Sequence, residues 1–330
     1  MEDLYLGWIE QMKKGIEKWG NIVLEMKPRL IIISGMGGSG VVGDYILALS
    51  YNRSDALPVI VVKNYRLPMY VNEKDLVFII SYSGNTLETR HAFYEALKKN
   101  AEVVAITSNG VLAKEVKEKN IPLIMITPGL VPRTALPEML YAVLGVLDTS
   151  GIHIVSKGEA EQALSFIEDE IKNIIEEAYS IATFIHKQGG NLVIATHTPL
   201  EVLALRGKNE FNENAKIPVK VEVIPEWAHN DIVGWENPYT GRWTILTIVN
   251  NDDQIDLKLI EFMESIYREH DFPVRRIELR GTSLLEKLLY GSLLLGLASI
   301  KLARIRGLNP LQTKSIIKYK SFINTVLQPR

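Results

Sequence analysis

The stretch Ser34–Gly40 contains four glycines between two apolar segments, and it constrains the fold more than any other part of the chain. An apolar run, Arg29–Ile33, precedes it, and a helix-like run, Val41–Ser50, follows it. This order predicts a strand, a glycine-rich turn and the start of a helix. Because glycine has no Cβ, backbone N–H groups can converge in such a turn at the positive end of a helix dipole. The expected ligand is an anion, most often a phosphate.

Short β-branched runs alternate with helix-like segments on both sides of this turn. Strands are predicted at Leu30–Ser34, Pro58–Lys63, Leu76–Ser81, Val103–Ser108 and Leu123–Thr127. Helices are expected after Gly40, Asn85 and Val111, and over Thr134–Leu147. Apolar strands joined by helices indicate an α/β fold with a parallel sheet covered on both faces.

The same alternation returns near residue 191. Strands are predicted at Leu192–Thr196, Val221–Ile224, Thr244–Val249 and Arg276–Leu279. Helices are predicted at Glu2–Met26, Lys157–Lys187, Pro199–Ala215, Ile255–His270, Ser283–Arg306 and Lys314–Leu327. We therefore expect two successive doubly wound, flavodoxin-like domains, residues 1–150 and 151–330, that pack tightly because no long Pro/Gly linker separates them.

Composition and charge narrow the possible partners. The net charge of -2 gives no overall basic surface for nucleic acid, so a phosphate must be bound locally. The absence of cysteine excludes disulfides, a cysteine nucleophile, Fe–S clusters and cysteine-ligated zinc. It fits a reducing cytoplasm or a hot habitat that disfavours thermolabile thiols. The N-terminus lacks a signal-peptide pattern, and the apolar stretch Leu288–Ile300 is too short to span a bilayer. We expect a cytoplasmic protein without a nucleic-acid or membrane partner.

Ligands of open parallel sheets bind beyond the carboxyl ends of the strands. Four loops are expected there: Gly35–Gly40, Ser81–Thr86, Pro128–Thr134 and Thr196–Thr198. The first formally matches the dinucleotide pattern G-x-G-x-x-G, but the next strand ends without the acidic residue that NAD binding needs. Lys63 at that place leaves NADP binding as an alternative.

The second loop is rich in hydroxyl groups. Ser81, Ser83 and Thr86 can face one point above a helix N-terminus and bind a phosphate without a lysine. The alternative is ordinary helix capping, with Asn85 as N-cap and Glu88 as its capping-box partner. Capping accounts for one or two of these side chains but not for three hydroxyls.

Further stretches carry candidate catalytic side chains. Arg133 follows the fifth predicted strand, where a cation can stabilise negative charge. Glu210 and Glu213 are three residues apart among three asparagines, which predicts that both carboxylates share one helical face and provide a general base. His229 is a stronger candidate for a proton shuttle than His197.

The C-terminal stretch begins a helix at Asn309-Pro310. Thr313 and Lys320 are seven residues apart and are expected to share a face of this helix, with Lys318 as an alternative to Lys320.

Six motifs together resemble the bifunctional phosphoglucose/phosphomannose isomerases of archaea, which belong to the phosphoglucose isomerase superfamily and consist of two sugar isomerase (SIS) domains. In order, they are Gly35–Gly40, Ser81–Thr86, Pro132–Pro137, Asn209–Lys216, Pro225–Asn230 and Asn309–Thr313. The second motif alone indicates only an SIS domain. The six together are specific and extend over nearly the whole chain.

The resemblance implies a role for each matching residue. The groups that bind the sugar 6-phosphate would be Gly37, Gly38, Ser39, Ser81, Ser83 and Thr86. Glu213 would be the base that moves a proton between C1 and C2, and Arg133 would stabilise the cis-enediolate. His229 and Lys320 would assist ring opening, with His229 supplied by the partner subunit of a homodimer that shares its active sites. Thr313 stands where strict glucose isomerases carry a bulkier glutamine, and the extra room would admit the mannose epimer.

The implied activity is reversible isomerisation of glucose 6-phosphate and mannose 6-phosphate with fructose 6-phosphate, without a cofactor or metal. Another SIS enzyme, such as an amidotransferase-type isomerase domain or phosphoheptose isomerase, would explain the phosphate loops but not Glu213, His229 and Thr313. A non-catalytic SIS regulator would lack the base and would usually carry a basic DNA-binding module, which is missing here.

Overall fold

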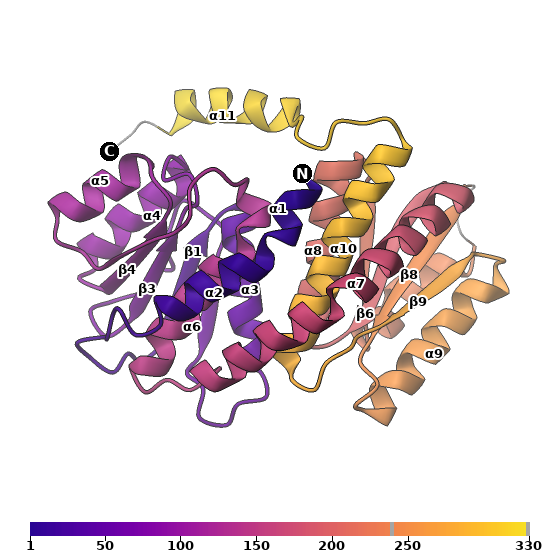
Figure 1. Cartoon of the computed structure of the whole chain (residues 1–330), viewed down its shortest axis with the longest axis horizontal. Coiled ribbons are helices and arrows are strands. Elements are labelled where there is room, and N and C mark those ends of the chain that lie inside the picture. The colour runs from indigo at the N-terminus through magenta and orange to yellow at the C-terminus, as the bar shows by residue number, and fades with distance from the viewer. Residues whose placement is uncertain (238–240, 328–330) are drawn as a thin grey trace. The chain divides into compact units, whose positions relative to one another are not determined.

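The computed structural model describes residues 1–237 and 241–327 and contains two compact units (Figure 1). The five-stranded unit comprises Leu6–Leu164 and the segment from Lys314 onward. The four-stranded unit comprises Met1–Tyr5 and Ser165–Thr313. The domain division at residue 150 stays a prediction, because these units are defined by contacts rather than by continuous sequence.

The five-stranded unit contains a fully parallel sheet with the strand order β2-β1-β3-β4-β5. Its strands are β1 (Ile31–Gly35), β2 (Val59–Val62), β3 (Leu76–Ile80), β4 (Glu102–Thr107) and β5 (Leu123–Met125). All residues of β1 and β3 are buried, as expected for strands covered on both faces. This order is that of a flavodoxin-like sheet, which confirms the predicted fold class for this unit.

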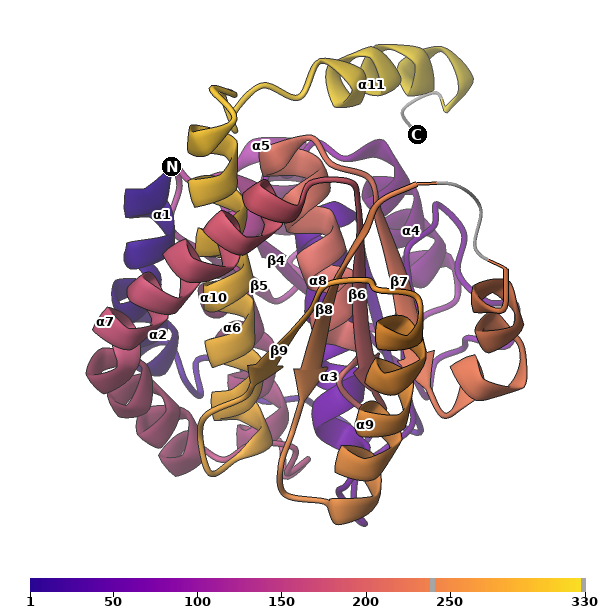
Figure 2. The ribbon, with the colours of Figure 1, turned by 90° about the vertical axis from the view of Figure 1, so that its right-hand side faces the viewer.

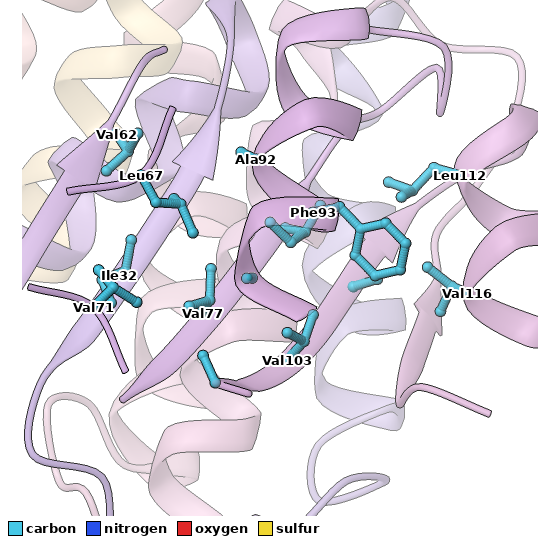
Figure 3. Packing of buried hydrophobic residues seen from close by; sticks show 14 of the residues in the cluster. Ile32, Val62, Leu67, Val71, Val77, Ala92, Phe93, Val103, Leu112 and Val116 are labelled. Atoms are coloured by element: carbon cyan, nitrogen blue, oxygen red, sulfur yellow. The ribbon is translucent and has the colours of Figure 1, made fainter. Parts of the chain in front are cut away.

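Helices cover both faces of this sheet. They are α2 (Trp8–Glu17), α3 (Gly37–Ser50), α4 (Leu87–Lys98), α5 (Gly110–Glu118) and α6 (Leu136–Thr149). The unit also contains the short 3-10 helix η1 (Pro132–Thr134) and the C-terminal helix α11 (Lys314–Val326), in which no residue is buried. Figure 3 shows the core on one face, where Phe93 of α4 lies above the sheet and its ring extends toward Leu112 and Val116 of α5. On the opposite face, a Cβ on Gly43 of α3 would lie 2.8 Å from Val61, so α3 packs closely on the sheet there.

The four-stranded unit repeats the same topology without the last strand. Its strands are β6 (Asn191–His197), β7 (Val219–Ile224), β8 (Trp243–Val249) and β9 (Val274–Glu278). They are all parallel, in the order β7-β6-β8-β9. The first four strands of the other sheet have the equivalent order, so the structure confirms the predicted tandem arrangement of doubly wound units.

The helices of this unit also cover two faces. They are α1 (Glu2–Leu6), α7 (Lys157–Gln188), α8 (Glu201–Glu210), the π-helical turn η2 (Phe211–Ala215), the 3-10 helices η3 (Glu226–His229) and η4 (Asp231–Trp235), α9 (Gln254–Glu269) and α10 (Leu284–Ile305). Residue 6 of α1 and the first turns of α7 fall outside the unit's bounds. Figure 2 shows α9 beside β8 and β9, where Met263 and Tyr267 join the core with Trp227 and Trp235. On the other face, Gly207 of α8 approaches Ile194 of β6.

Among the described helices, α10 alone is long and apolar enough to cross a membrane. However, 83% of its most apolar window is buried within the protein, as in the core helix of a globular fold.

Two helix predictions are wrong in detail. The predicted helix Glu2–Met26 consists of two helices that join at Gly7, and the second ends at Glu17. The predicted helix Pro199–Ala215 is α-helical only to Glu210 and then widens into the π turn η2. The periodicity of apolar residues reports neither the break at Gly7 nor the widening after Glu210.

Candidate active site

The switch point of the five-stranded sheet lies between β1 and β3, where the following helices leave toward opposite faces. The loops Gly35–Gly40 and Ser81–Thr86 therefore flank one crevice. The backbone N–H of Tyr82 donates a hydrogen bond to Ser39 Oγ at 3.0 Å, which joins the two loops directly. Ser39 accepts this bond and keeps its own O–H available for a ligand.

The glycines of the first loop are needed at specific contacts. A Cβ on Gly38 would lie 2.7 Å from the backbone of Pro132 and Arg133, so this loop touches the η1 turn. Gly37 has φ +54, a left-handed conformation that favours glycine. Helix α3 begins at Gly37, earlier than predicted, and its N-cap Met36 makes no side-chain capping bond. The N–H groups of Ser39 and Gly40 donate to Met36 O, so within this first turn it is the N–H groups of Gly37 and Gly38 that have no helical carbonyl to bond.

The hydroxyl groups of the second loop are not consumed by capping. Ser81 Oγ is buried and has no hydrogen-bond partner among the described residues. Thr86 is the N-cap of α4 but makes no side-chain capping bond. Asn85, the predicted alternative cap, instead accepts a hydrogen bond from Val111 N at the start of α5. The capping interpretation is therefore wrong for Asn85 with Glu88, and these hydroxyls can serve a ligand.

The loop that carries Arg133 is attached to the same crevice by Tyr82. Its hydroxyl donates to Thr127 O at 3.0 Å and accepts from Leu130 N at 2.6 Å. Burial raises the pKa of this phenol, so it stays protonated and keeps both roles. Arg133 itself is buried, with 7% of its surface exposed. Tyr82 lies inside the motif Ser81–Thr86, yet nothing in that motif indicates that its side chain fixes the arginine loop.

Lys63, which kept NADP binding open, forms an ion pair with Asp44 of α3. Asp44 therefore pairs with the ammonium group that the alternative assigned to the 2′-phosphate of NADP. The structure therefore gives no support to the dinucleotide alternative.

The C-terminal helix α11 also reaches the second loop. Tyr319 OH donates a hydrogen bond to Glu88 Oε1 at 2.7 Å, two residues beyond Thr86. This bond raises the pKa of Tyr319 above its usual range. Lys318 and Lys320 flank Tyr319, and both are exposed. The bond from Tyr319 places α11 beside the first turn of α4, and Lys318 and Lys320 stay alternatives.

In the four-stranded unit, Glu213 lies in the π turn η2 and is partly buried. Glu210 is fully buried and forms an ion pair with Arg206, which is also buried. Glu210 and Glu213 do not share one helical face as predicted, because the wider π turn replaces α-helical spacing after Glu210. Glu213 is thus the accessible carboxylate of the pair.

The remaining candidates lie in the same unit. His229 ends η3 and is exposed, whereas His197 is buried at the end of β6. Thr313 directly precedes α11 and lies outside that helix, so it does not share a helical face with Lys320 as predicted. Within residues 1–237 and 241–327, no three His, Asp or Glu side chains gather so that they could hold a metal ion.

Two family models match this chain, one in its N-terminal half and one in its C-terminal half. Residues 26–111 match the SIS domain model, and residues 174–323 match the model of the bacterial phospho-glucose isomerase C-terminal SIS domain. A solved structure, the C-terminal domain of glucosamine-fructose-6-phosphate aminotransferase from Francisella tularensis, has a TM-score of 0.73 at 16% identity and covers 94% of this chain and 97% of its own. At that identity the likeness shows the fold alone.

Two relatives cover the chain almost completely. A protein from Sulfolobus acidocaldarius named D-glucosamine-6-phosphate 4-epimerase is 27% identical and covers 99% of both chains. A protein from Aquifex aeolicus named bifunctional phosphoglucose/phosphomannose isomerase is 34% identical over 92% of this chain and 93% of its own. This identity and coverage confirm the resemblance seen in the six motifs: the chain belongs to the bifunctional phosphoglucose/phosphomannose isomerase family.

Proposed function

We propose that this protein interconverts glucose 6-phosphate and mannose 6-phosphate with fructose 6-phosphate. The observation that carries this proposal is the pair of loops after β1 and β3, where the buried Ser81 hydroxyl has no partner among the described residues and helix α3 begins at Gly37. An orphaned buried hydroxyl costs roughly 1–3 kcal/mol, so a ligand with strong acceptor oxygens is its natural partner. A phosphate group has that chemistry.

The phosphate would be bound by groups from two loops. These groups are the N–H of Gly37 and Gly38 and the hydroxyls of Ser39, Ser81, Ser83 and Thr86. The phosphate does not react, so its binding serves to hold the sugar in register. Binding energy from this remote group orients the carbons where the proton moves.

Glu213 is the proposed base. Its carboxylate takes the proton from C2 of the open-chain aldose and returns it to C1, while the hydroxyl proton moves from O2 to O1. C2 is thereby oxidised to a ketone and C1 is reduced to an alcohol, so no external oxidant or reductant is required. Glu210 cannot compete for this role because it is buried and paired with Arg206.

Other side chains have supporting roles in the proposal. Arg133 would stabilise the negative charge of the cis-enediolate, and one well-placed donor is worth about 3 kcal/mol in such a transition state. His229 and Lys320 would transfer protons in ring opening. Thr313 would leave room for the epimer at C2.

A homodimer in the cytoplasm is part of the same proposal. None of the residues of α11 is buried, and Ile317, Phe322 and Val326 are about 60% exposed. A helix with such an apolar surface gains little stability alone, and a second copy of this chain is the proposed occupant of that surface. Sedimentation equilibrium measures this directly, and a single-chain mass would contradict it.

The activity is tested by incubating the protein with fructose 6-phosphate in the presence of EDTA. Both glucose 6-phosphate and mannose 6-phosphate are expected as products. Glucose 6-phosphate alone would contradict only the role of Thr313, whereas the absence of any aldose would overturn the function. Incubation with glucosamine 6-phosphate tests the activity in the name of the Sulfolobus acidocaldarius relative, because a 4-epimer would form if this chain shared that activity.

The base is tested with Glu213→Gln. Loss of proton transfer is expected, with nearly unchanged inhibition by inorganic phosphate, since the amide cannot accept the C2 proton. Glu269→Gln, an exposed carboxylate on α9, is the matched control and should retain wild-type activity. Turnover of Glu213→Gln near that of the control would remove Glu213 from this role.

A further inference from the structure

The π turn that carries Glu213 rests on a buried group of polar side chains in the four-stranded unit. Glu210, one turn earlier, is fully buried, and so are Asn214 and Tyr5 of the N-terminal helix α1. Arg206 contacts Glu210 Oε1 through its guanidinium group. Polar groups so deep in a protein are stable only when they are paired with one another.

The hydrogen bonds of this group form a consistent set. Tyr5 OH donates to Glu210 Oε2. The side-chain amide of Asn214 donates to the same oxygen at 2.8 Å and to Ser299 Oγ at 2.9 Å. Ser299 in turn donates to the carbonyl of Gly296 at 2.6 Å. Glu210 therefore has Arg206 at Oε1 and both Tyr5 and Asn214 at Oε2. Asn214, the residue after Glu213, is held by Glu210 and by Ser299.

The opposite side of the π turn is fixed through its carbonyl groups. Arg306 donates to Ala215 O, and Lys216 Nζ donates to Glu213 O and, at 2.7 Å, to Gln312 O. Lys216 has φ +57 and ends the turn in a left-handed conformation. A π turn is an uncommon geometry that persists only when its surroundings stabilise it, and it is frequent at functional sites.

Helix α1 contributes Tyr5 to this group, although Tyr5 precedes Glu210 by 205 residues in the sequence. A Cβ on Gly296 would lie 2.4 Å from Tyr5 Cε1, so the tyrosine ring packs directly on α10. Ion pairs of Glu2 with Lys301 and Arg304 hold the start of α1 on the same helix. The position of the Tyr5 hydroxyl is therefore fixed by packing as well as by hydrogen bonds.

We propose that Tyr5, Arg206, Glu210, Asn214 and Ser299 form a positioning network that holds the π turn and thereby aims the carboxylate of Glu213 at the substrate. The inference rests on the proposed role of Glu213 as the base. A base must lie within hydrogen-bond reach of the proton it removes, and a misplacement of about 1 Å can cost about 100-fold in rate. The network acts through Glu213 and touches no substrate itself.

The test compares two buried tyrosines that each donate a hydrogen bond to a glutamate. Tyr5→Phe removes the bond to Glu210, and Tyr290→Phe removes the bond from Tyr290 to Glu177, which measures 2.6 Å. Both tyrosines are fully buried, so a general loss of stability should be similar in the two variants. We expect kcat to fall about tenfold in Tyr5→Phe only, with unchanged KM for fructose 6-phosphate and unchanged inhibition by inorganic phosphate.

A kcat of Tyr5→Phe within twofold of Tyr290→Phe would overturn the proposal. If Tyr5→Phe does not fold, Ser299→Ala decides, because it removes one partner of Asn214 and leaves Tyr5 and Glu210 in place. A reduction of kcat of about threefold supports the network, and an unchanged kcat refutes it. Failure of the proposed base would show separately, since Glu213→Gln would then keep the wild-type kcat.

Discussion

The switch points of the two sheets have the same strand order, but they differ in which polar side chains already have hydrogen-bond partners. In the five-stranded unit, Tyr82 N after β3 donates to Ser39 Oγ in the loop after β1. In the four-stranded unit, Asn250 N after β8 donates at 3.1 Å to His197 Nε2 at the end of β6. Each bond joins the two loops that flank its switch point.

The difference lies in how the remaining polar groups are satisfied. Since His197 Nε2 accepts a bond, Nδ1 carries the proton, and it lies 3.0 Å from Thr198 O and 3.2 Å from Asp256 Oδ2. Buried Lys287 donates to Asn250 at 2.9 Å and pairs with Asp252. His197, Asn250, Lys287 and Asp252 therefore pair among themselves, whereas Ser81 on the other edge has no described partner. The duplicated topology thus has one switch point with an unpaired buried hydroxyl and one whose histidine, asparagine and lysine are already paired.

The largest effect should come from adding one methyl group to the first loop of the five-stranded unit. Gly38→Ala would place a Cβ 2.7 Å from the backbone of Pro132 and Arg133, so the two loops must separate. We expect kcat/KM for each sugar 6-phosphate to fall about 100-fold, because the phosphate loop and Arg133 lose their register. Steady-state kinetics measure this.

Gly234→Ala is the matched control in the other unit, where a Cβ on Gly234 would meet no atom within 4 Å. Its kinetics should match the wild type. If Gly38→Ala were as active as this control, the contact between the first loop and the Arg133 turn would be irrelevant to function.

A smaller effect should distinguish the roles of two hydroxyl groups, one at each switch point, by their influence on KM and on melting temperature. Ser81→Ala removes a hydroxyl without a described partner, so stability should not fall, while KM should rise about tenfold or more. Thr196→Val removes a bond of 2.9 Å to Ile248 O, so the melting temperature should fall by about 2–4 °C with KM unchanged. Kinetics and thermal melting of both variants check this, and equal behaviour of the two would refute the contrast between the edges.

The smallest effect should be a pH dependence of folding stability that comes from the pair of Lys287 and Asp252. The hydrogen bond from Lys287 lowers the pKa of Asp252 below its ordinary value. The stabilisation is therefore present above about pH 4 and is lost as the pH falls through the lower folded-state pKa. Because Asp252 is 65% exposed, the pair should contribute only about 0.2–1 kcal/mol.

Asp252→Asn should accordingly be slightly less stable than the wild type at pH 7, and this difference should disappear in acid. Melting curves at both pH values measure it, and Asp55→Asn on the surface of the other unit controls for the lost charge. Activity should not change in either variant. A difference that persists at low pH would show that Lys287 does not stabilise the ionised form of Asp252.

The general architecture could be predicted from the chain because its signals are local. Apolar β-branched runs such as Ile31–Ile33 and Val103–Ile106 are strands wherever helices cover both faces, and glycine-rich and hydroxyl-rich loops mark the ends of strands. The six motifs also indicated the family, which the comparisons confirm. The roles of Glu213, His229, Arg133 and Lys320 stay predictions.

Other features depend on contacts between distant residues, and no periodicity could reveal them. Asn85 caps α5 rather than α4 because folding places Val111 N within its reach. The widening of α8 into a π turn depends on Arg306, Lys216 and the buried side chains beneath it. Local propensity would favour a regular helix there.

Residue types a few positions apart are enough to predict the parallel sheets, the glycine-rich and hydroxyl-rich loops at their strand ends and the carboxylate run near residue 213. Which polar groups at the two switch points are paired, and which carboxylate is accessible, follows from tertiary contacts alone. Whether a buried hydroxyl or carboxylate finds a partner depends on side chains brought together by folding. Tyr5 from the first helix donates to Glu210, while Ser81 has no hydrogen-bond partner among the described residues.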